Sequence, residues 1–460
     1  MISRKDIASL HLPHNKNTAS CVPIRIETPE EVVLPMNMHF GHDAEPVVSV
    51  GSHVRVGQLI AREEGRFSSP VHATVSGTVA AIEPIECSND EKVMSIRIKS
   101  DGLMEKDPRI APHNVKTAEE FIAAVRDGGI VGLGGAAFPT WAKFNEILNP
   151  EYKVDTILIN AAECEPYITS DHRMMLDHPD LIVKGVNYIR ECLAEYLHNA
   201  TFNICIEKNK PDAIAVLKKA FKDYDDVVIQ ELNTVYPQGA KQVMLYNVAG
   251  RVAVAGRRFP SFGALIINVS SLAKTAEYLS TGMPLVERIV TVDGTAVKEP
   301  VNLIVPIGTR ISELLKYTSL KGKVCKAVIG GPMNGYAVCS VDSPIVKAAN
   351  CVLLFDEKTA ELRDASACIR CGRCVFVCPI NINVAAVEPA RRIRDEQKRV
   401  ETLINTGVRQ CIDCASCSYV CPANRPLLGY NREAKQYLKQ YEYDMTQKER
   451  RQSKGEKTNE

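Results

Sequence analysis

The hydrophobic pattern divides the chain into a β-rich stretch, a stretch of alternating strands and helices, a second β-rich stretch and a cysteine-rich stretch. Residues 31–99 contain short β-branched runs separated by Gly, Pro and Ser, which predicts a small all-β module. From about 117 to 290, apolar runs of strand length alternate with amphipathic helical patterns. This order predicts a mainly parallel sheet covered by helices, which binds its ligands at the carboxyl ends of the strands.

Both β-rich stretches resemble known modules. The patterns VSVGSHVRVGQ and ATVSGTVAAIE look like the halves of a biotinyl- or lipoyl-type barrel-sandwich hybrid. The attachment lysine of carrier modules is missing, because the tip of the candidate hairpin reads Val71, His72, Ala73, Thr74. We therefore expect a structural role for this module. Residues 285–355, with the short helical pattern TRISELLKY, resemble the soluble-ligand-binding β-grasp modules of electron-transfer chains.

Composition and charge exclude several classes of protein. Hydrophobic residues make up 45% and charged residues 24% of the 460 residues, which is typical of a folded chain with several domains. The formal net charge of +1, without long blocks of one sign before the tail, gives no reason to expect a nucleic-acid partner. No apolar run is long enough for a membrane-spanning helix, and the first residues lack the apolar core of a secretion signal. We expect a cytoplasmic protein, at most peripheral to a membrane through a partner.

The cysteines carry the strongest chemical signal. Of 16 cysteines, eight form two copies of the pattern C-x2-C-x2-C-x3-C-P, which is typical of ferredoxins with two 4Fe-4S clusters. The first copy consists of Cys368, Cys371, Cys374 and Cys378, and the second of Cys411, Cys414, Cys417 and Cys421. In such repeats three cysteines bind one cluster and the fourth binds the other. One predicted ligand set is therefore Cys368, Cys371, Cys374 and Cys421, and the other is Cys411, Cys414, Cys417 and Cys378.

A pair of zinc sites is the alternative, but zinc ligands usually come as separated pairs rather than triplets followed by C-P. Seven scattered cysteines are expected to be buried or inert thiols: Cys21, Cys87, Cys192, Cys205, Cys325, Cys339 and Cys351. The charged linker between the motifs predicts a solvated helix. Its Arg391, Arg392 and Arg394 could dock an acidic electron carrier, although a plain solvated face is the simpler interpretation.

A glycine-rich loop lies earlier in the chain. Gly132, Gly134 and Gly135 precede the helical pattern WAKFNEIL. Such a loop lets the backbone approach a phosphate, which the helix N-terminus then stabilises. By itself this signal is weak, because a tight structural turn has the same composition.

The stretches GLGGAAFPTWAKF and NAAECEPYITSDHR resemble the FMN-binding loops of the flavoprotein subunit of respiratory complex I. They resemble still more closely those of RnfC, a subunit of the Rnf ion-translocating oxidoreductase. The stretches VYPQGAKQVMLYNVAGR and PLVERIVTVDGTAV and both cysteine motifs are also similar to RnfC, in the same order from about residue 30 to 440. By this resemblance the chain is identified as a member of the RnfC family.

The resemblance implies the cofactor-binding residues. Gly132, Gly134, Gly135 and Lys143 match the loop that holds the FMN phosphate, and Asn268 matches a further flavin contact.

A second loop and an aromatic position complete the set that the resemblance implies. Asn160, Glu163 and Glu165 match the loop that contacts the flavin and, in the complex I relative, the nicotinamide nucleotide. Phe138 falls where an aromatic ring stacks near the NADH adenine.

Two departures weaken the expectation of NADH binding more than that of FMN binding, because Ala162 replaces an acidic residue of the complex I proteins and Leu133 replaces an arginine. Ala137 stands where glycine is frequent, which is a minor steric change. The N-terminal segment also differs from that of typical RnfC proteins. Glu163 and Glu165 could, from the residues alone, be ordinary loop charges.

The predicted fold class is a multidomain α/β protein with five segments. They are a barrel-sandwich region at 1–110, a complex I flavoprotein-like α/β domain at 111–284, a β-grasp module at 285–355, a two-cluster ferredoxin-type domain at 356–442 and a disordered tail at 443–460.

The predicted function is electron transfer between NAD(H), FMN and two 4Fe-4S clusters in an Rnf-type ferredoxin:NAD oxidoreductase. Its expected partners are the other redox subunits, with NADH or ferredoxin as electron source. The alternative is a soluble electron-transfer protein that feeds a dedicated reductase, as proteins associated with proline reductase or cobalamin reductase do. A third possibility, a scaffold that has lost its flavin, is disfavoured by the presence of Lys143, Asn160 and Glu163.

Overall fold

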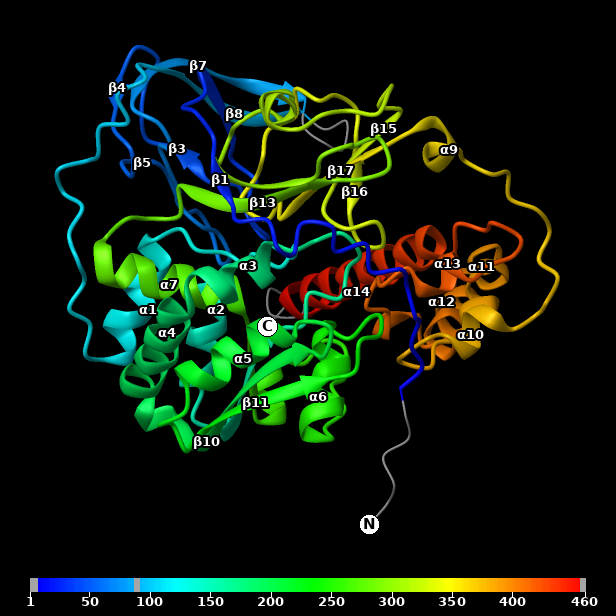
Figure 1. Ribbon diagram of the computed structural model, residues 1–460. Helices are drawn as coiled ribbons and strands as arrows, with labels where there is room; N and C mark the ends of the chain where they lie inside the picture. Colours follow the sequence, from blue (N-terminus) through cyan, green and yellow to red (C-terminus); the bar gives the residue numbers. More distant parts are fainter. Residues whose placement is uncertain (1–6, 87–91, 456–460) are drawn as a thin grey trace. The chain divides into compact units, whose positions relative to one another are not determined.

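The computed structural model describes residues 7–86 and 92–455 (Figure 1). It divides into two compact units. The larger unit contains residues 12–234 and 258–361, and the smaller unit contains residues 1–11, 235–257 and 362–460.

The first module of the larger unit is all-β, as the short β-branched runs predict, and its strands pair in antiparallel fashion. One sheet has the order β2-β8-β7-β4, and a second has the order β3-β5-β6. The strands are β2 (Glu31–Pro35), β3 (Glu45–Pro46), β4 (His53–Val54), β5 (Leu59–Arg62), β6 (Val71–His72), β7 (Gly77–Glu86) and β8 (Lys92–Ser100). The four residues 71–74, expected at a hairpin tip, are all buried. The position where a carrier module would expose its attachment side chain is therefore inside the fold.

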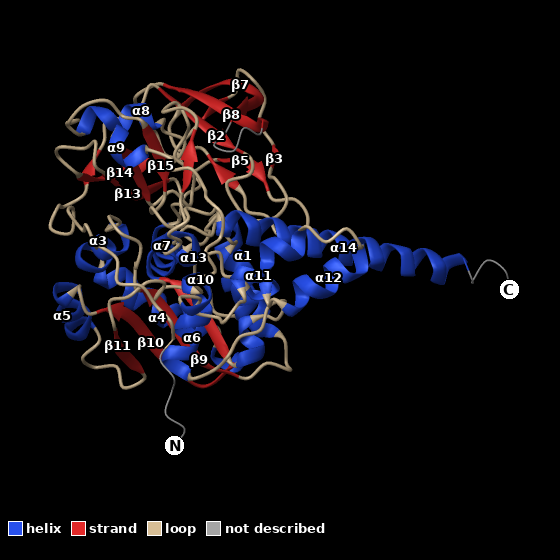
Figure 2. Ribbon diagram, turned by 90° about the vertical axis from the view of Figure 1, so that its right-hand side faces the viewer, coloured by secondary structure: helices blue, strands red, loops and turns tan. Residues whose placement is uncertain are grey.

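The second module contains the predicted parallel sheet, with the order β11-β10-β9-β12 and parallel pairing throughout. Its strands are β9 (Val154–Ala161), β10 (Leu197–Glu207), β11 (Val227–Leu232) and β12 (Ala264–Asn268). Helices lie beside this sheet, as Figure 2 shows by colour: α4 (Pro179–Cys192), α5 (Pro211–Ala220) and α7 (Val269–Thr281). Helix α1 (Ala118–Asp127) packs against α7. Asn160 and Asn268 are register partners at the carboxyl ends of β9 and β12.

The third module is a mixed six-stranded sheet with the order β1-β14-β13-β17-β15-β16. Five of its strands come from one stretch: β13 (Glu287–Asp293), β14 (Val301–Pro306), β15 (Lys326–Ile329), β16 (Tyr336–Val338) and β17 (Cys351–Phe355). The short helix α8 (Ile311–Leu314) follows β14, where the sequence predicts it. The edge strand β1 (Ile24–Arg25) comes from the N-terminal region, which the sequence assigns to the barrel-sandwich module.

The smaller unit is mostly helical. Its helices are α6 (Lys241–Ala249), α10 (Arg373–Phe376), α11 (Val384–Arg391), α12 (Glu396–Asn405), α13 (Ser416–Tyr419) and α14 (Leu427–Gly455). Val387, Leu403, Ala434 and Leu438 form part of its apolar core.

The C-terminal end differs from the sequence prediction. Disorder was expected from residue 443, whereas α14 continues to Gly455. Lys, Glu, Arg and Gln dominate this stretch, and they are good helix formers that extend a helix once it has been nucleated. Residues 456–460 of the predicted tail, and Cys87, lie outside the described residues. Over residues 7–86 and 92–455, no helix combines the length and the apolar character needed to cross a bilayer.

Candidate functional site

The glycine-rich loop is closed by its own backbone. Gly132 N donates to Phe138 O at 2.8 Å, and Ala137 N donates to Gly132 O at 3.1 Å. Gly135 has a φ of +104°, and a Cβ placed there would meet no atom within 4 Å, so the loop presents bare backbone to open space. The loop leads into the short helix α2 (Thr140–Asn145), which contains the predicted Lys143.

Asn268 joins the glycine loop to the edge of the parallel sheet. Its Oδ1 accepts a hydrogen bond from Ser271 N at 3.0 Å and caps α7, while its Nδ2 donates to Asp171 Oδ2 at 2.6 Å. A Cβ at Gly134 would lie 3.1 Å from Asn268 Nδ2, so glycine permits the close approach. Leu133 N donates to Ser271 Oγ at 2.9 Å. The structure therefore brings two sequence-predicted regions together at one sheet edge.

Asn160 lies near the carboxyl end of β9, and its Oδ1 accepts a hydrogen bond from Ala162 N at 3.2 Å, at the start of the loop after the strand. Glu163 follows with a φ of +48°, and its side chain is only 3% exposed. The Glu163 carboxylate accepts hydrogen bonds from Asp171 N at 2.6 Å and His172 N at 3.3 Å, at the start of α3 (Ser170–Asp177). It therefore satisfies the first amides of that helix.

Burial controls the protonation of Glu163. The pKa of its carboxyl is raised to about 7, mainly by desolvation and also by the nearby Asp171, whereas Lys16 opposes the shift. Burial likewise raises the pKa of Asp171, whose carboxylate accepts hydrogen bonds from Ser270 and Asn268. A flavin contact by Glu163 stays a prediction. Its observed partners all belong to the protein itself: the amides of Asp171 and His172, the Ser170 hydroxyl and Lys16.

Glu165, the second acid of this loop, points to the six-stranded sheet. Its Oε2 accepts a hydrogen bond from Met333 N at 3.0 Å, in the turn between β15 and β16. A Cβ at Gly331 would lie 2.1 Å from the same oxygen, so this turn needs glycine to approach the carboxylate. Glu165 thus connects the loop after β9 to the third module.

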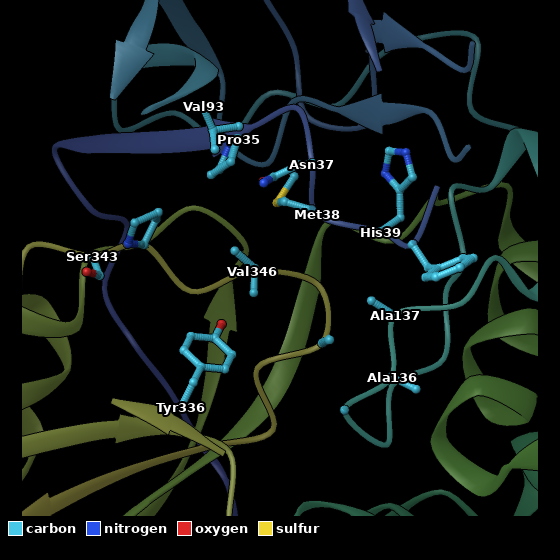
Figure 3. Close-up of a pocket in the computed structure, with 14 residues that line it drawn as sticks. Pro35, Asn37, Met38, His39, Val93, Ala136, Ala137, Tyr336, Ser343 and Val346 are labelled. Carbon is cyan, nitrogen blue, oxygen red and sulfur yellow. The ribbon is translucent and has the colours of Figure 1, made fainter. Parts of the chain in front are cut away.

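Phe138 packs between two rings of the first module. Its ring centroid lies 5.6 Å from that of Phe40 and 5.5 Å from that of Phe67. The exposed side of the glycine loop, at Ala136 and Ala137, opens into a cavity of about 290 Å³. Figure 3 shows that this loop forms one wall and that the other walls come from the first and third modules. Other lining residues include Asn37, His39, Tyr336, Ser343 and Val346.

Three buried or half-buried residues of this region were missed by the sequence predictions. Lys16 Nζ donates to three carbonyl groups of the loop after β9. Lys210 Nζ donates to Ala162 O at 2.7 Å and pairs with the buried Glu207 at 3.2 Å. Cys164 lies half-buried between the two loop acids. Lys16 and Lys210 stand in polar stretches outside any recognised motif, so only the tertiary structure could show their partners.

The first predicted cluster site surrounds a cavity. Cys368, Cys371, Cys374 and Cys421 all line a space of about 470 Å³ in the smaller unit. This set combines three cysteines of one motif with the last cysteine of the other, as the sequence predicts. Cys368 and Cys371 are exposed, which places this site at the surface of its unit.

The cysteines of the second predicted cluster site are more shielded. Cys378 and Cys417 are buried, and Cys411 and Cys414 are half-buried. Burial, together with the smaller influence of Cys414, Cys411 and Cys378, raises the pKa of the Cys417 thiol to about 12. Such thiols ionise readily only when a metal binds them.

Polar groups also approach these sulfurs. Asn431 Nδ2 donates to Cys411 Sγ at 3.6 Å, Ile382 N donates to Cys378 Sγ at 3.3 Å, and Cys414 Sγ lies 3.4 Å from Ser416 Oγ. At the first site, Arg370 N donates to Cys368 Sγ at 3.4 Å. Hydrogen bonds to sulfur tune the potential of a cluster.

No group of three or more His, Cys, Asp or Glu side chains within the described ranges is arranged to hold a single metal ion. The two cysteine sets are cluster candidates by their motifs, and the first set also lines a cavity.

Two of the three linker arginines form ion pairs. Arg391 pairs with Glu433, and Arg392 pairs with Glu388. These pairs agree with the interpretation as a solvated, charge-balanced face.

Three family models match the chain in the predicted order. The RnfC barrel sandwich hybrid domain matches residues 8–103, the Nuo51 FMN-binding domain matches residues 125–277 and the 4Fe-4S dicluster domain matches residues 360–422. The RnfC protein of the Na(+)-translocating ferredoxin:NAD(+) oxidoreductase complex of Acetobacterium woodii is 36% identical over 381 residues, which cover 81% of this chain and 84% of that protein. The counterpart from the proton-translocating complex of Clostridium ljungdahlii is 35% identical, with 81% of each chain covered.

The chain belongs to the RnfC family. The resemblance found in the sequence is thereby confirmed, as are the barrel-sandwich, FMN-binding and dicluster domains. FMN and 4Fe-4S clusters are accordingly the cofactors of this RnfC family member. A crystal structure of an NAD+-reducing NiFe hydrogenase aligns with a TM-score of 0.43 at 17% identity, covering 64% of this chain and 53% of that one.

Proposed function

We propose that this chain transfers electrons between NAD(H), FMN and two 4Fe-4S clusters as the RnfC component of an ion-translocating ferredoxin:NAD+ oxidoreductase. The observation that carries the proposal is the union of an FMN-binding domain and a dicluster domain in one chain, in a family whose relatives are named as parts of such complexes. These names do not favour the alternative of an adaptor for a soluble reductase.

The proposed flavin site is the glycine loop together with the edge of the parallel sheet. Backbone groups at Gly132, Gly134 and Gly135 would hold the phosphate, with Lys143 supplying positive charge. Asn160 and Asn268 would contact the flavin from the two strand ends. When bound, FMN accepts two electrons together and releases them singly.

The two acids of the loop after β9 contact different elements of the larger unit. Glu163 and Glu165 hold the loop to α3 and to the third module, which supports a role in shaping the flavin site. Phe138 would stack near the adenine of NADH. Because Ala162 and Leu133 depart from the complex I pattern, direct NADH binding needs its own test.

The proposed cluster ligands are those predicted from the motifs. Cys368, Cys371, Cys374 and Cys421 would hold the surface cluster, and Cys411, Cys414, Cys417 and Cys378 would hold the shielded cluster. The protein would fix the clusters in position and tune their reduction potentials through hydrogen bonds to sulfur.

The finer assignments belong to the same proposal. We take residues 1–110, 111–284, 285–355, 356–442 and 443–460 as the functional segments, with a β-grasp module in the third. The partners would be the membrane-bound redox subunits, which would hold this chain at the cytoplasmic face of the membrane, and electrons would enter from NADH or from ferredoxin.

Cofactor analysis of the anaerobically purified chain tests this proposal. We expect about eight irons and one FMN per chain. Cys421→Ala and Cys378→Ala, in which each motif loses its last cysteine, should each lower the iron content and disturb the spectrum of a different cluster. The proposal fails if the wild-type chain lacks flavin or if zinc replaces iron.

A further inference from the structure

A segment before the first module lies along the proposed flavin loop. Residues 14–18, which we call the N-terminal strap, cross the loop formed by residues 162–169. Tyr167 N donates to His14 O at 2.9 Å, and the hydroxyls of Thr18 and Thr169 lie 2.5 Å apart. The strap is itself anchored to the third module, where Asn17 Nδ2 donates to Asp293 Oδ2 at 3.1 Å.

Lys16 is the centre of this contact. Its Nζ donates to Glu163 O at 2.8 Å, to Glu165 O at 2.9 Å and to Ile168 O at 2.6 Å. An ammonium group has three donors, and here each one has a carbonyl acceptor. The side chain is only 14% exposed, so water competes weakly for these bonds.

The loop has a conformation that needs such support. Glu163 and Tyr167 have φ values of +48° and +70°, a region that residues other than glycine rarely adopt. Three carbonyl oxygens converge on one point, where without a cation their dipoles would repel one another. Lys16 supplies that cation, and the Glu163 carboxylate lies 4.0 Å away on the same group.

Charged groups on several elements face this point. Lys210, Glu207 and Cys164 also interact electrostatically with Lys16. Lys210 holds a different carbonyl, that of Ala162, and is itself paired with Glu207. The two lysines therefore bind different carbonyl groups of the same loop and have separate roles.

We propose that Lys16 is a positioning residue that holds the loop of residues 162–169 in the shape required for FMN binding. The inference rests on the proposed function, because that function makes this loop part of the flavin site. Lys16 touches no reacting atom. It acts by fixing the loop that carries Glu163 and Glu165 and that begins after Asn160.

FMN titration of the deflavinated full-length chain tests the inference through the quenching of flavin fluorescence. Lys16→Met keeps most of the stem but removes all three bonds, and we expect its dissociation constant for FMN to rise about tenfold or more, a change of about 1.4 kcal/mol. Lys16→Arg keeps the charge but not the compact geometry, so it should restore affinity only in part. Lys274→Met, the matched control, removes a lysine with the same exposed fraction of 14%, which pairs with Glu277 in α7, and should leave FMN affinity within about twofold of wild type.

The urea midpoint of the larger unit, reported by Trp141 fluorescence, separates positioning from a loss of folding. Lys16→Met should still unfold cooperatively, and its iron content should stay at the wild-type value because the cluster cysteines belong to the other compact unit. Equal FMN affinity in wild type and Lys16→Met would overturn the inference and leave the proposed function intact. If Lys16→Met does not fold, the FMN affinity of Lys16→Arg tests the inference instead. An affinity equal to that of wild type would show that the three converging hydrogen bonds are not required, and would overturn the inference. Failure of the wild-type chain to bind FMN would instead contradict the proposed function.

Discussion

At the scale of single residues, the two cluster sites differ in their surroundings. The shielded site receives a hydrogen bond from Asn431, a residue only 1% exposed, whereas Cys368 and Cys371 of the other site are exposed. Donors to sulfur stabilise the more negative, reduced state of a cluster and raise its potential. The two clusters should therefore respond differently to changes in α14.

Replacing Asn431 should shift one cluster only. Asn431→Leu removes the donor to Cys411 Sγ, so we expect the midpoint potential of the shielded cluster to fall while that of the surface cluster stays constant. A redox titration followed by electron paramagnetic resonance can separate the two signals. Equal shifts of both would contradict the assignment of Cys411 to a separate cluster, and no shift at all would contradict a tuning role for the Asn431 hydrogen bond.

Glu163 should give the stability of the larger unit a pH dependence. Its folded pKa of about 7 lies above the ordinary value of 4.5, so the folded state holds the proton more tightly. The stabilising contribution is complete below about pH 4.5 and is lost as pH rises through about 7. Relative to wild type, Glu163→Gln should therefore gain stability over this window, by up to about 3 kcal/mol.

Urea unfolding followed by Trp141 fluorescence measures this difference, because Trp141 is the only tryptophan and lies in α2 of the same unit. A stability difference between variant and wild type that does not change from pH 4.5 to 7 would show that the carboxyl is not shifted.

At the scale of elements, the sequence predicted the parallel sheet and its helices because their hydrophobic periods are local and regular. It did not predict β1, a pair of residues whose strand character depends on a distant partner, β14. It also did not predict the role of Lys16, because the partners of Lys16 are backbone carbonyl groups, which every residue type has. The glycine loop and both cysteine motifs could be predicted, because the glycines that give backbone freedom and the spacing of the cysteines are properties of the sequence itself.

The glycine loop offers a test with a neighbouring control. Ala137 has a φ of +49°, which costs a non-glycine residue about 1 kcal/mol or more. Ala137→Gly should therefore stabilise the larger unit by a few tenths to about 1 kcal/mol after the added freedom of the unfolded chain is counted. Ala136→Gly, one residue earlier and outside the positive-φ set, should destabilise it.

Urea midpoints reported by Trp141 compare the two variants. The same sign of change in both would contradict the left-handed conformation at Ala137.

At the scale of the whole molecule, one segment connects the two proposed cofactor regions along the chain. Residues 235–257 lie between β11 and β12 in sequence but belong to the compact unit of the cluster motifs. Within that unit, Tyr236 Oη donates to Cys414 O at 2.9 Å, and Ala255 N donates to Gln410 Oε1 at 2.7 Å. The sequence assigned this stretch to the α/β domain, since helix and strand patterns cannot report which unit a segment packs against.

Electrons are proposed to pass from NADH through FMN to the clusters within this chain. Anaerobic titration of the purified full-length protein with NADH, followed at the flavin and cluster absorbance bands, tests this electron path most directly. We predict that both bands bleach together as NADH is added. Bound FMN and intact clusters that NADH leaves oxidised would contradict the claim.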